Sequence, residues 1–336
     1  MLLSKEISQS RYLQTLSVCS LVSSDLKRMQ EGFVEINSVP THIFTYGQWI
    51  QDEFKKKELV LIITGNPGLP GFYTTFASTI FNELKEEIPV WVIGQAGHDE
   101  PKKELNMITP PLKGNEDIYN LKGQLDHKKE FINRFIPKDV KIYMIGHSIG
   151  SKMSLDLLKI PEFSNQIQSA YLMFPTIERM AESTKGRLVP TYDRFFFLFR
   201  IFYNFIAWLP KSWKLYLVRR YCEREKLPLE FHEPSLEYTN PPVIDKIWFL
   251  ALDEMDKVRE LDEKLLKENV NRVKLYYAVV DDWVPLDAYD SLKTKIPNID
   301  AQVCTEGYEH AFVLNNGVEV GKIVSGWLNI KRQETQ

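Results

Sequence analysis

The sequence contains few cysteines and none of the short spacings that bind zinc. Only three of its 336 residues are cysteine, and Cys19, Cys222 and Cys304 lie far apart without any Cys-x-x-Cys pair. An odd and scattered set favours neither a disulfide framework nor a metal site. The cysteine content therefore fits a reducing compartment, and we expect no metal.

The chain also lacks a strong charge of either sign. Its 42 lysines and arginines nearly balance 45 acidic residues, which leaves a formal net charge of -3. Such a chain has no long-range field that attracts a nucleic-acid backbone. The phosphate-binding patterns Gly-x-x-x-x-Gly-Lys and Gly-x-Gly-x-x-Gly do not occur either. We therefore expect no nucleic-acid partner.

No apolar run is long enough to cross a bilayer, which takes about 20 mostly apolar residues. The most apolar segment, residues 195–209, is shorter and carries Arg200 near its middle. Its aromatic residues include Phe195, Phe196, Phe199, Phe202, Phe205 and Trp208. A segment that is apolar on all sides must be buried in something. Two interpretations stay open, namely ordinary core and contact with a lipid surface.

Residues 1–31 carry no pattern to which we assign a function. Their apolar stretch at 13–22 is interrupted by Gln14, Thr15 and serines, which makes a poor signal peptide. We interpret the segment as a frayed extension ahead of the first strand. An organelle-targeting or amphipathic segment is the weaker alternative.

Short apolar runs alternate with helical stretches along the rest of the chain. Residues 33–36 and 41–44 predict an antiparallel edge hairpin. Further strands are predicted at 59–63, 90–93, 141–145, 170–174, 273–280 and 301–304. This alternation is typical of βαβ units, so we predict an α/β fold whose mostly parallel central sheet is flanked by helices. Residues 32–336 would form one domain.

Two of the helical regions between the strands stand out. The clearer one precedes the strand at 141–145 and predicts one apolar face, with lysines and acids on the other; the apolar positions are Ile118, Leu121, Leu125, Ile132, Phe135 and Ile136. Between about residues 178 and 267 the strand patterns stop, and the sequence becomes helical and aromatic. We predict an inserted helical cap there.

The stretch Gly146-His147-Ser148-Ile149-Gly150 matches the nucleophile elbow of α/β-hydrolases. It follows the apolar run 142–145 directly and precedes a helical stretch at 152–160, as the elbow requires. The serine of an elbow has a strained backbone, and side chains at Gly146 or Gly150 would collide with their surroundings. Ser148 is therefore the candidate nucleophile, with a Gly-flanked helix cap as the alternative.

A serine hydroxyl needs a base, and the base in turn needs an acid that orients it. The chain order in this fold is Ser, acid, His, and of the two histidines after Ser148, His232 falls in the predicted cap. His310, which follows the strand at 301–304, is our candidate base. Asp281 follows the strand at 273–280 and is our candidate acid, with Asp282 as its nearest competitor.

The developing oxyanion needs backbone donors. The turn Thr64-Gly65-Asn66-Pro67-Gly68 follows the strand at 59–63 and stands where many α/β-hydrolases carry His-Gly-x-Pro. By that match we expect the N–H groups of Asn66 and Ile149 to face the oxyanion.

Several blocks in one order make the chain from about residue 32 onward resemble the lipid droplet-associated hydrolase family. They are Gly65-Asn66-Pro67-Gly68 with Phe72-Tyr73, Pro89-Val90-Trp91 with Ala96-Gly97-His98, Asp117-Ile118-Tyr119 with Gly123-Gln124, the elbow through Ser151, and Phe174-Pro175-Thr176-Ile177-Glu178-Arg179-Met180. The last block is the most specific, because the hydrolase fold does not require it. Asp281 and His310-Ala311-Phe312 match as well. The N-terminal extension and Asp126, where relatives tend to have Glu, depart from the family pattern.

The resemblance implies a serine hydrolase of lipid droplets and the endoplasmic reticulum, on their cytosolic face. It implies sterol esters such as cholesteryl esters as substrates and little triglyceride lipase activity. We expect a cofactor-independent esterase whose aromatic cap contacts the lipid monolayer. The alternative is a droplet surface scaffold with little or no turnover.

Overall fold

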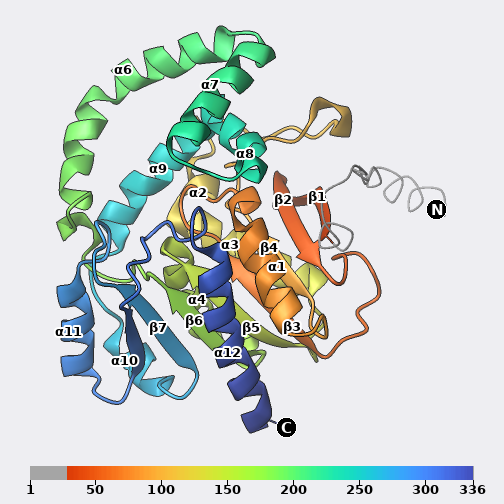
Figure 1. Cartoon of the computed structure of the whole chain (residues 1–336), viewed down its shortest axis with the longest axis vertical. Coiled ribbons are helices and arrows are strands. Elements are labelled where there is room, and N and C mark those ends of the chain that lie inside the picture. Colours follow the sequence, from red (N-terminus) through yellow and green to blue (C-terminus); the bar gives the residue numbers. More distant parts are fainter. Residues whose placement is uncertain (1–28, 336) are drawn as a thin grey trace.

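An eight-stranded sheet runs through the computed structural model, which describes residues 29–335 (Figure 1). Its strand order is β1-β2-β4-β3-β5-β6-β7-β8, and only the β1-β2 and β2-β4 pairs are antiparallel. The strands are β1 (Met29–Ile36), β2 (Val39–Tyr46), β3 (Glu58–Ile63), β4 (Val90–Ile93), β5 (Lys141–His147), β6 (Ile167–Met173), β7 (Val273–Ala278) and β8 (Asp300–Cys304). All the predicted strands are present. Since β1 begins at Met29, residues 29–31 belong to the sheet, and the rest of the predicted extension lies outside the described residues.

Helices cover both faces of the sheet, because its central strands are apolar on both sides. Along β3, Leu59, Leu61 and Ile63 enter one buried cluster, whereas Val60 and Ile62 enter another. The first cluster contains side chains of α3 (Leu121–Phe135), α4 (Ile149–Leu158), α10 (Glu263–Glu268) and α11 (Leu286–Lys295). The second contains side chains of α1 (Thr74–Glu83) and α12 (Gly317–Thr335). A strand buried on both faces reads as a continuous apolar run, which is why the sequence revealed it.

The helix predicted from residue 118 to residue 136 is two helices, α2 (Glu116–Tyr119) and α3. Asn120 between them is extended, and its side chain caps α3 by accepting from the Gly123 N–H at 2.8 Å. The capping preference of asparagine outweighs the apolar periodicity here. The prediction that the lysines of this helix take the solvent face is wrong for Lys128, which is fully buried.

Four helices between β6 and β7 stand outside the two helical layers: α6 (Val189–Trp208), α7 (Lys211–Arg224), α8 (His232–Leu236) and α9 (Pro241–Lys257). In Figure 1, α6 arches away from the body at the outer edge of this group. The cap was expected to extend to about residue 267, but α10 packs into the core through Leu265 and Leu266. α9 also contributes one side chain, Leu250, to this core cluster.

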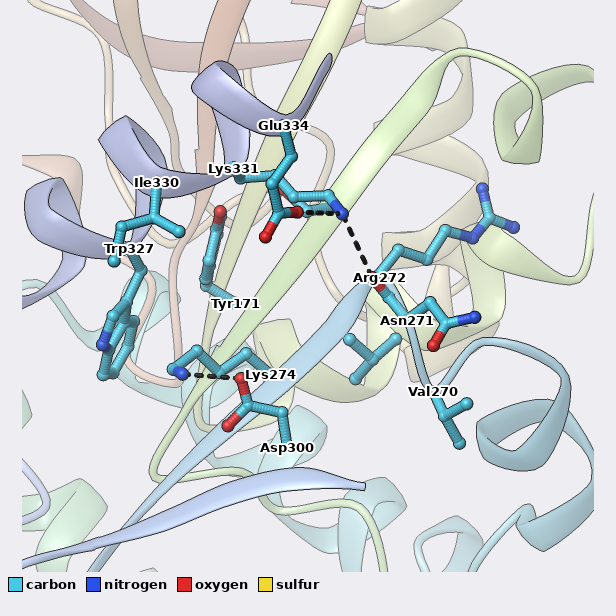
Figure 2. A pocket seen from close by; sticks show the side chains of 12 residues that line it. Tyr171, Val270, Asn271, Arg272, Lys274, Asp300, Trp327, Ile330, Lys331 and Glu334 are labelled. Carbon is cyan, nitrogen blue, oxygen red and sulfur yellow. Dashed lines mark hydrogen bonds and ion pairs between the residues drawn. The ribbon is translucent and has the colours of Figure 1, made fainter. Parts of the chain in front are cut away.

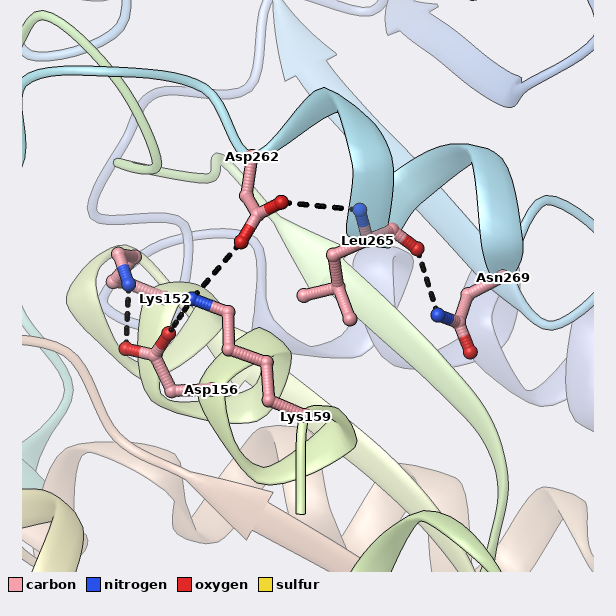
Figure 3. A network of polar contacts seen from close by, with 6 residues as sticks. All are labelled: Lys152, Asp156, Lys159, Asp262, Leu265 and Asn269. Atoms are coloured by element: carbon pink, nitrogen blue, oxygen red, sulfur yellow. Dashed lines mark hydrogen bonds and ion pairs between the residues drawn. The ribbon is translucent and has the colours of Figure 1, made fainter. Parts of the chain in front are cut away.

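A polar network joins α10 to α4, the helix that follows the elbow (Figure 3). Lys159 of α4 binds Asp156 at 2.7 Å and Asp262 at 3.0 Å. Asp262 also caps α10 by accepting from the Leu265 N–H at 3.0 Å. This network fixes α10 beside α4, at the end of α4 remote from Ser148. Within residues 29–335, none of the helices is both long enough and apolar enough to span a membrane.

Candidate active site

Ser148 lies at the sharp turn between β5 and α4. Its backbone has φ 53° and ψ -121°, a left-handed conformation that costs free energy in a non-glycine residue. The turn is tight on both sides: a Cβ on Gly146 would lie 2.6 Å from the Gly150 carbonyl oxygen, and one on Gly150 would lie 2.3 Å from the Ile63 carbonyl oxygen. Only glycine fits at either position, as the sequence predicted for an elbow.

The structure brings Ser148, His310 and Asp281 into one hydrogen-bonded chain. His310 Nε2 lies 2.9 Å from Ser148 Oγ, and His310 Nδ1 lies 2.7 Å from Asp281 Oδ2. A carboxylate only accepts, so Nδ1 carries the ring proton and Nε2 is free to accept from the serine hydroxyl. This is the tautomer that a general base requires.

The loop after β7 holds Asp281 in place. The Asp281 side chain is fully buried, and its Oδ1 accepts from the N–H groups of Trp283 at 2.8 Å and Val284 at 3.0 Å. Asp282, the competing acid, is half exposed and pairs with Lys185 at 3.3 Å. Only Asp281 of this pair reaches His310.

His147 points away from Ser148 and joins three parts of the site. Its Nε2 donates to the His310 carbonyl at 2.9 Å, and Tyr73 donates to its Nδ1 at 2.6 Å. The Tyr73 oxygen accepts in turn from the Gly65 N–H at 2.8 Å. Burial, with a further electrostatic contribution from His310, lowers the pKa of His147 to about 3. His147 therefore stays neutral and keeps this arrangement of donors and acceptors.

The remaining histidines have structural surroundings. His42 lies between Asp99 and Glu31, His98 accepts from the Gly68 N–H, and His127 bonds to Thr41 at 2.7 Å. His232 is the first residue of α8 in the cap, as the sequence predicted. None of these bonds involves the elbow.

The predicted oxyanion turn lies against the elbow. A Cβ on Gly65 would lie 3.1 Å from Ser148 Cβ, and Ile149 is the first residue of α4, where helix N–H groups lack intrahelical partners. No acceptor in residues 29–335 takes the Asn66 N–H. The bond between Asn66 and Pro67 is cis.

Buried polar side chains support this turn from behind. Gln95 donates to the Thr64 carbonyl at 2.7 Å, and Lys128 donates to Gln95 Oε1 at 2.8 Å. Burial lowers the pKa of Lys128 well below its ordinary value. The sequence carries no local signal for these roles, because each residue bonds to a segment about 30 positions away.

The apolar segment of α6 is not core. Five of its six predicted contact residues, namely Phe195, Phe199, Phe202, Phe205 and Trp208, are between 46% and 88% exposed. Phe196 is the exception, since it stacks on Trp248 of α9 with ring centroids 5.0 Å apart. The interpretation as ordinary core is therefore wrong, and α6 with α7 exposes a broad aromatic surface.

A cavity of about 160 Å³ has none of the elbow residues in its lining, most of which Figure 2 labels. Its lining includes Ser169, Lys274 and Asp300, which stand near the starts of β6, β7 and β8. Ser148, Asp281 and His310 follow the ends of parallel strands, at the opposite edge of the sheet. Lys274 pairs with Asp300 at 2.6 Å, and Lys331 pairs with Glu334 at 3.1 Å. In the part of the chain that the structure describes, no three His, Cys, Asp or Glu side chains are grouped to hold a metal.

Comparison with known proteins shows the family of this chain. The family model described as lipid-droplet associated hydrolase matches residues 56–313. The lipid droplet-associated hydrolase of Drosophila melanogaster is 45% identical over 311 residues, which cover 91% of this chain and 100% of the relative. The chain belongs to the lipid droplet-associated hydrolase family. The mouse and human members are 33% and 32% identical over 90% of this chain, and over 95% and 97% of their own lengths.

Solved structures show the same fold at low sequence identity. A carboxylesterase from Nitrososphaera gargenis has a TM-score of 0.59 at 15% identity and covers 90% of this chain and all of its own. A serine hydrolase from Cycloclasticus zankles has a TM-score of 0.56 at 15% identity, over 90% of this chain and 98% of its own. The fold is thus an α/β-hydrolase fold, as predicted, and the family gives the chain a hydrolase role associated with lipid droplets.

Proposed function

We propose that this hydrolase cleaves lipid esters, with cholesteryl esters as the leading candidates, through an acyl-enzyme on Ser148. The observation that carries the proposal is the chain from Ser148 Oγ through His310 to Asp281, with distances of 2.9 and 2.7 Å at a strained elbow. Residues 32–336 would act as one catalytic domain under its helical cap.

In the first half-reaction, Ser148 Oγ attacks the ester carbonyl while His310 Nε2 takes the hydroxyl proton. The N–H groups of Asn66 and Ile149 stabilise the oxyanion, and Asp281 stabilises the imidazolium. Collapse of the tetrahedral intermediate breaks the ester C–O bond, and His310 returns the proton to the leaving alcohol. The acyl group remains on Ser148.

In the second half-reaction, water takes the place of the alcohol. The water oxygen attacks the acyl carbonyl while His310 Nε2 accepts a proton from the water. His310 then returns the proton to Ser148 Oγ. The products are the free acid and the original serine. The cycle needs only residues of this chain, so we propose no metal and no organic cofactor.

We also propose that the exposed surface of α6 contacts the lipid monolayer of droplets or the endoplasmic reticulum, on their cytosolic face. An aromatic helix of this length, with Trp208 88% exposed, suits burial at the boundary of headgroups and acyl chains. Arg200 binds Asp245 of α9 at 2.9 Å, which turns its charge away from the lipid. No nucleic acid takes part in this function.

A substrate panel tests the esterase proposal. Purified wild-type protein and Ser148→Ala are assayed on cholesteryl, retinyl, glycerol and short-chain esters, presented as emulsions or in solution. We expect wild-type hydrolysis of at least one lipid ester and a loss of at least about 10³-fold in the variant. If neither protein hydrolyses any ester, a droplet surface scaffold is the better account.

Droplet flotation tests the role of α6 separately. The triple variant Phe202→Ser, Phe205→Ser, Trp208→Ser should remain in solution while the wild type floats with artificial droplets. Ile330→Ser, on the exposed side of α12, is the matched control and should float. Equal flotation of the triple variant and the wild type would reject α6 as the contact surface.

A further inference from the structure

One buried carboxyl group lies where the cap meets the predicted oxyanion turn. Glu254 of α9 is 1% exposed, and its Oε1 accepts from Asn66 Nδ2 at 3.0 Å. The same Asn66 amide donates to the Ile247 carbonyl, also on α9, at 3.2 Å. Two acceptors on one cap helix thus bind one side chain of the turn.

The surroundings of Glu254 disfavour its charged form. No basic side chain of residues 29–335 forms an ion pair with it, and burial raises its pKa to about 8, with a further contribution from Asp253. The Asn66 bond acts in the opposite direction. Elements packed against α9 bring other charged groups, among them Asp117 of α2, Lys122 of α3, Glu182 of η4 (Met180–Glu182), Arg200 of α6 and Glu237 of η7 (Glu237–Thr239). At neutral pH most Glu254 side chains carry a proton.

We propose that Glu254 is a positioning residue that acts as a neutral acid, and that together with the Ile247 carbonyl it fixes Asn66 so that its N–H faces the oxyanion. This proposal rests on the proposed function of the elbow. Asn66 belongs to a turn rather than to a helix or strand, so its backbone is held by such side-chain bonds and by Gln95 behind Thr64. The cap thereby takes part in assembling the catalytic site.

The neutral state matters because the reaction develops negative charge beside this turn. An ionised Glu254 still accepts from Asn66, but it places an unpaired negative charge next to the predicted oxyanion hole. Like charges in a poorly solvated site repel strongly. Ester hydrolysis should therefore fall as the pH rises through about 8.

The pH profile of hydrolysis tests the proposal. We would measure kcat and KM for a soluble p-nitrophenyl ester between pH 6 and 9, for wild type, Glu254→Gln and Glu254→Leu. The Gln variant keeps the acceptor and cannot ionise, so it should keep its pH 7 activity up to pH 9. The Leu variant loses the acceptor, so its kcat should fall about tenfold with little change in KM. Asp256→Asn, an exposed site on α9, should have the wild-type profile.

Two further arms keep the outcomes separate. Asp253→Asn removes a negative charge that raises the pKa of Glu254. The activity of this variant should therefore begin to fall at a lower pH than that of the wild type. If the activity of Glu254→Gln falls at alkaline pH as much as that of the wild type, the proposal is wrong. The Gln variant alone gives this answer, even if Glu254→Leu fails to fold. Labelling of Ser148 by a fluorophosphonate distinguishes the failures: an unlabelled wild type rejects the proposed function, whereas labelled protein with an unchanged alkaline fall in the Gln variant rejects only the role of Glu254.

Discussion

Replacing Tyr73 by phenylalanine should destabilise the protein, because one hydroxyl serves two buried partners. The Tyr73 side chain is 2% exposed; its oxygen accepts from the Gly65 N–H at 2.8 Å and donates to His147 Nδ1 at 2.6 Å. Phenylalanine fills the same space but leaves both groups unpaired. Each unsatisfied buried group costs about 1–3 kcal/mol, so for the two groups we expect a loss of about 2–6 kcal/mol.

Equilibrium unfolding in urea measures this loss, and Tyr277→Phe is the matched control. Tyr277 is also buried, but its hydroxyl has no hydrogen-bond partner among residues 29–335. Its removal should leave the free energy of unfolding unchanged or slightly higher. If Tyr73→Phe unfolds within about 0.5 kcal/mol of wild type, the hydroxyl is not the link between Gly65 and His147.

Two further substitutions have measurable outcomes. Asp281→Asn should lower kcat about 10³- to 10⁴-fold with KM nearly unchanged, since His310 loses the partner that holds its tautomer; a loss below tenfold in a steady-state ester assay would contradict the assigned acid. Glu254→Gln should become more stable relative to wild type as the pH rises. Folding raises the pKa of Glu254 from 4.5 to about 8, so this group stabilises the folded wild type fully below pH 4.5 and loses that contribution progressively up to pH 8. Glutamine does not titrate and loses nothing. At about 1.4 kcal/mol per pKa unit, the gain between pH 5 and pH 7 is on the order of 2 kcal/mol in denaturant titrations, and a pH-independent difference would be inconsistent with a buried neutral acid.

The strands of the sheet could be predicted because each is recognisable from its own residues. A run such as Leu59–Ile63 is buried on both faces, so its apolar character needs no knowledge of its neighbours. The elbow is equally local, since the clashes that select Gly146 and Gly150 arise within a few residues. Ser148 could therefore be predicted as the nucleophile from the sequence, and the order of acid and base along the chain predicted Asp281 and His310 as its partners.

Long-range partners set the limits of sequence prediction. Lys128 lies on a helix whose pattern places lysines outward, yet it is buried, and its amine donates a hydrogen bond to Gln95 Oε1. Glu254 is indistinguishable by pattern from the exposed Asp256, which follows it by two positions on α9, because its partner Asn66 is 188 residues away. The apolar sequence of α6 predicted only that the segment is buried in something. Its own residues do not distinguish burial in the protein core from contact with a lipid surface.

Covalent labelling tests whether Ser148 is a nucleophile that His310 activates. The purified full-length protein is treated with a fluorophosphonate, digested, and analysed by mass spectrometry for the peptide that contains the elbow, with Ser148→Ala and His310→Asn in parallel. We predict stoichiometric modification of Ser148 in the wild type, none in Ser148→Ala, and labelling at least about 10²-fold slower in His310→Asn. An unmodified Ser148 in folded wild-type protein, or equally fast labelling without His310, would contradict this prediction.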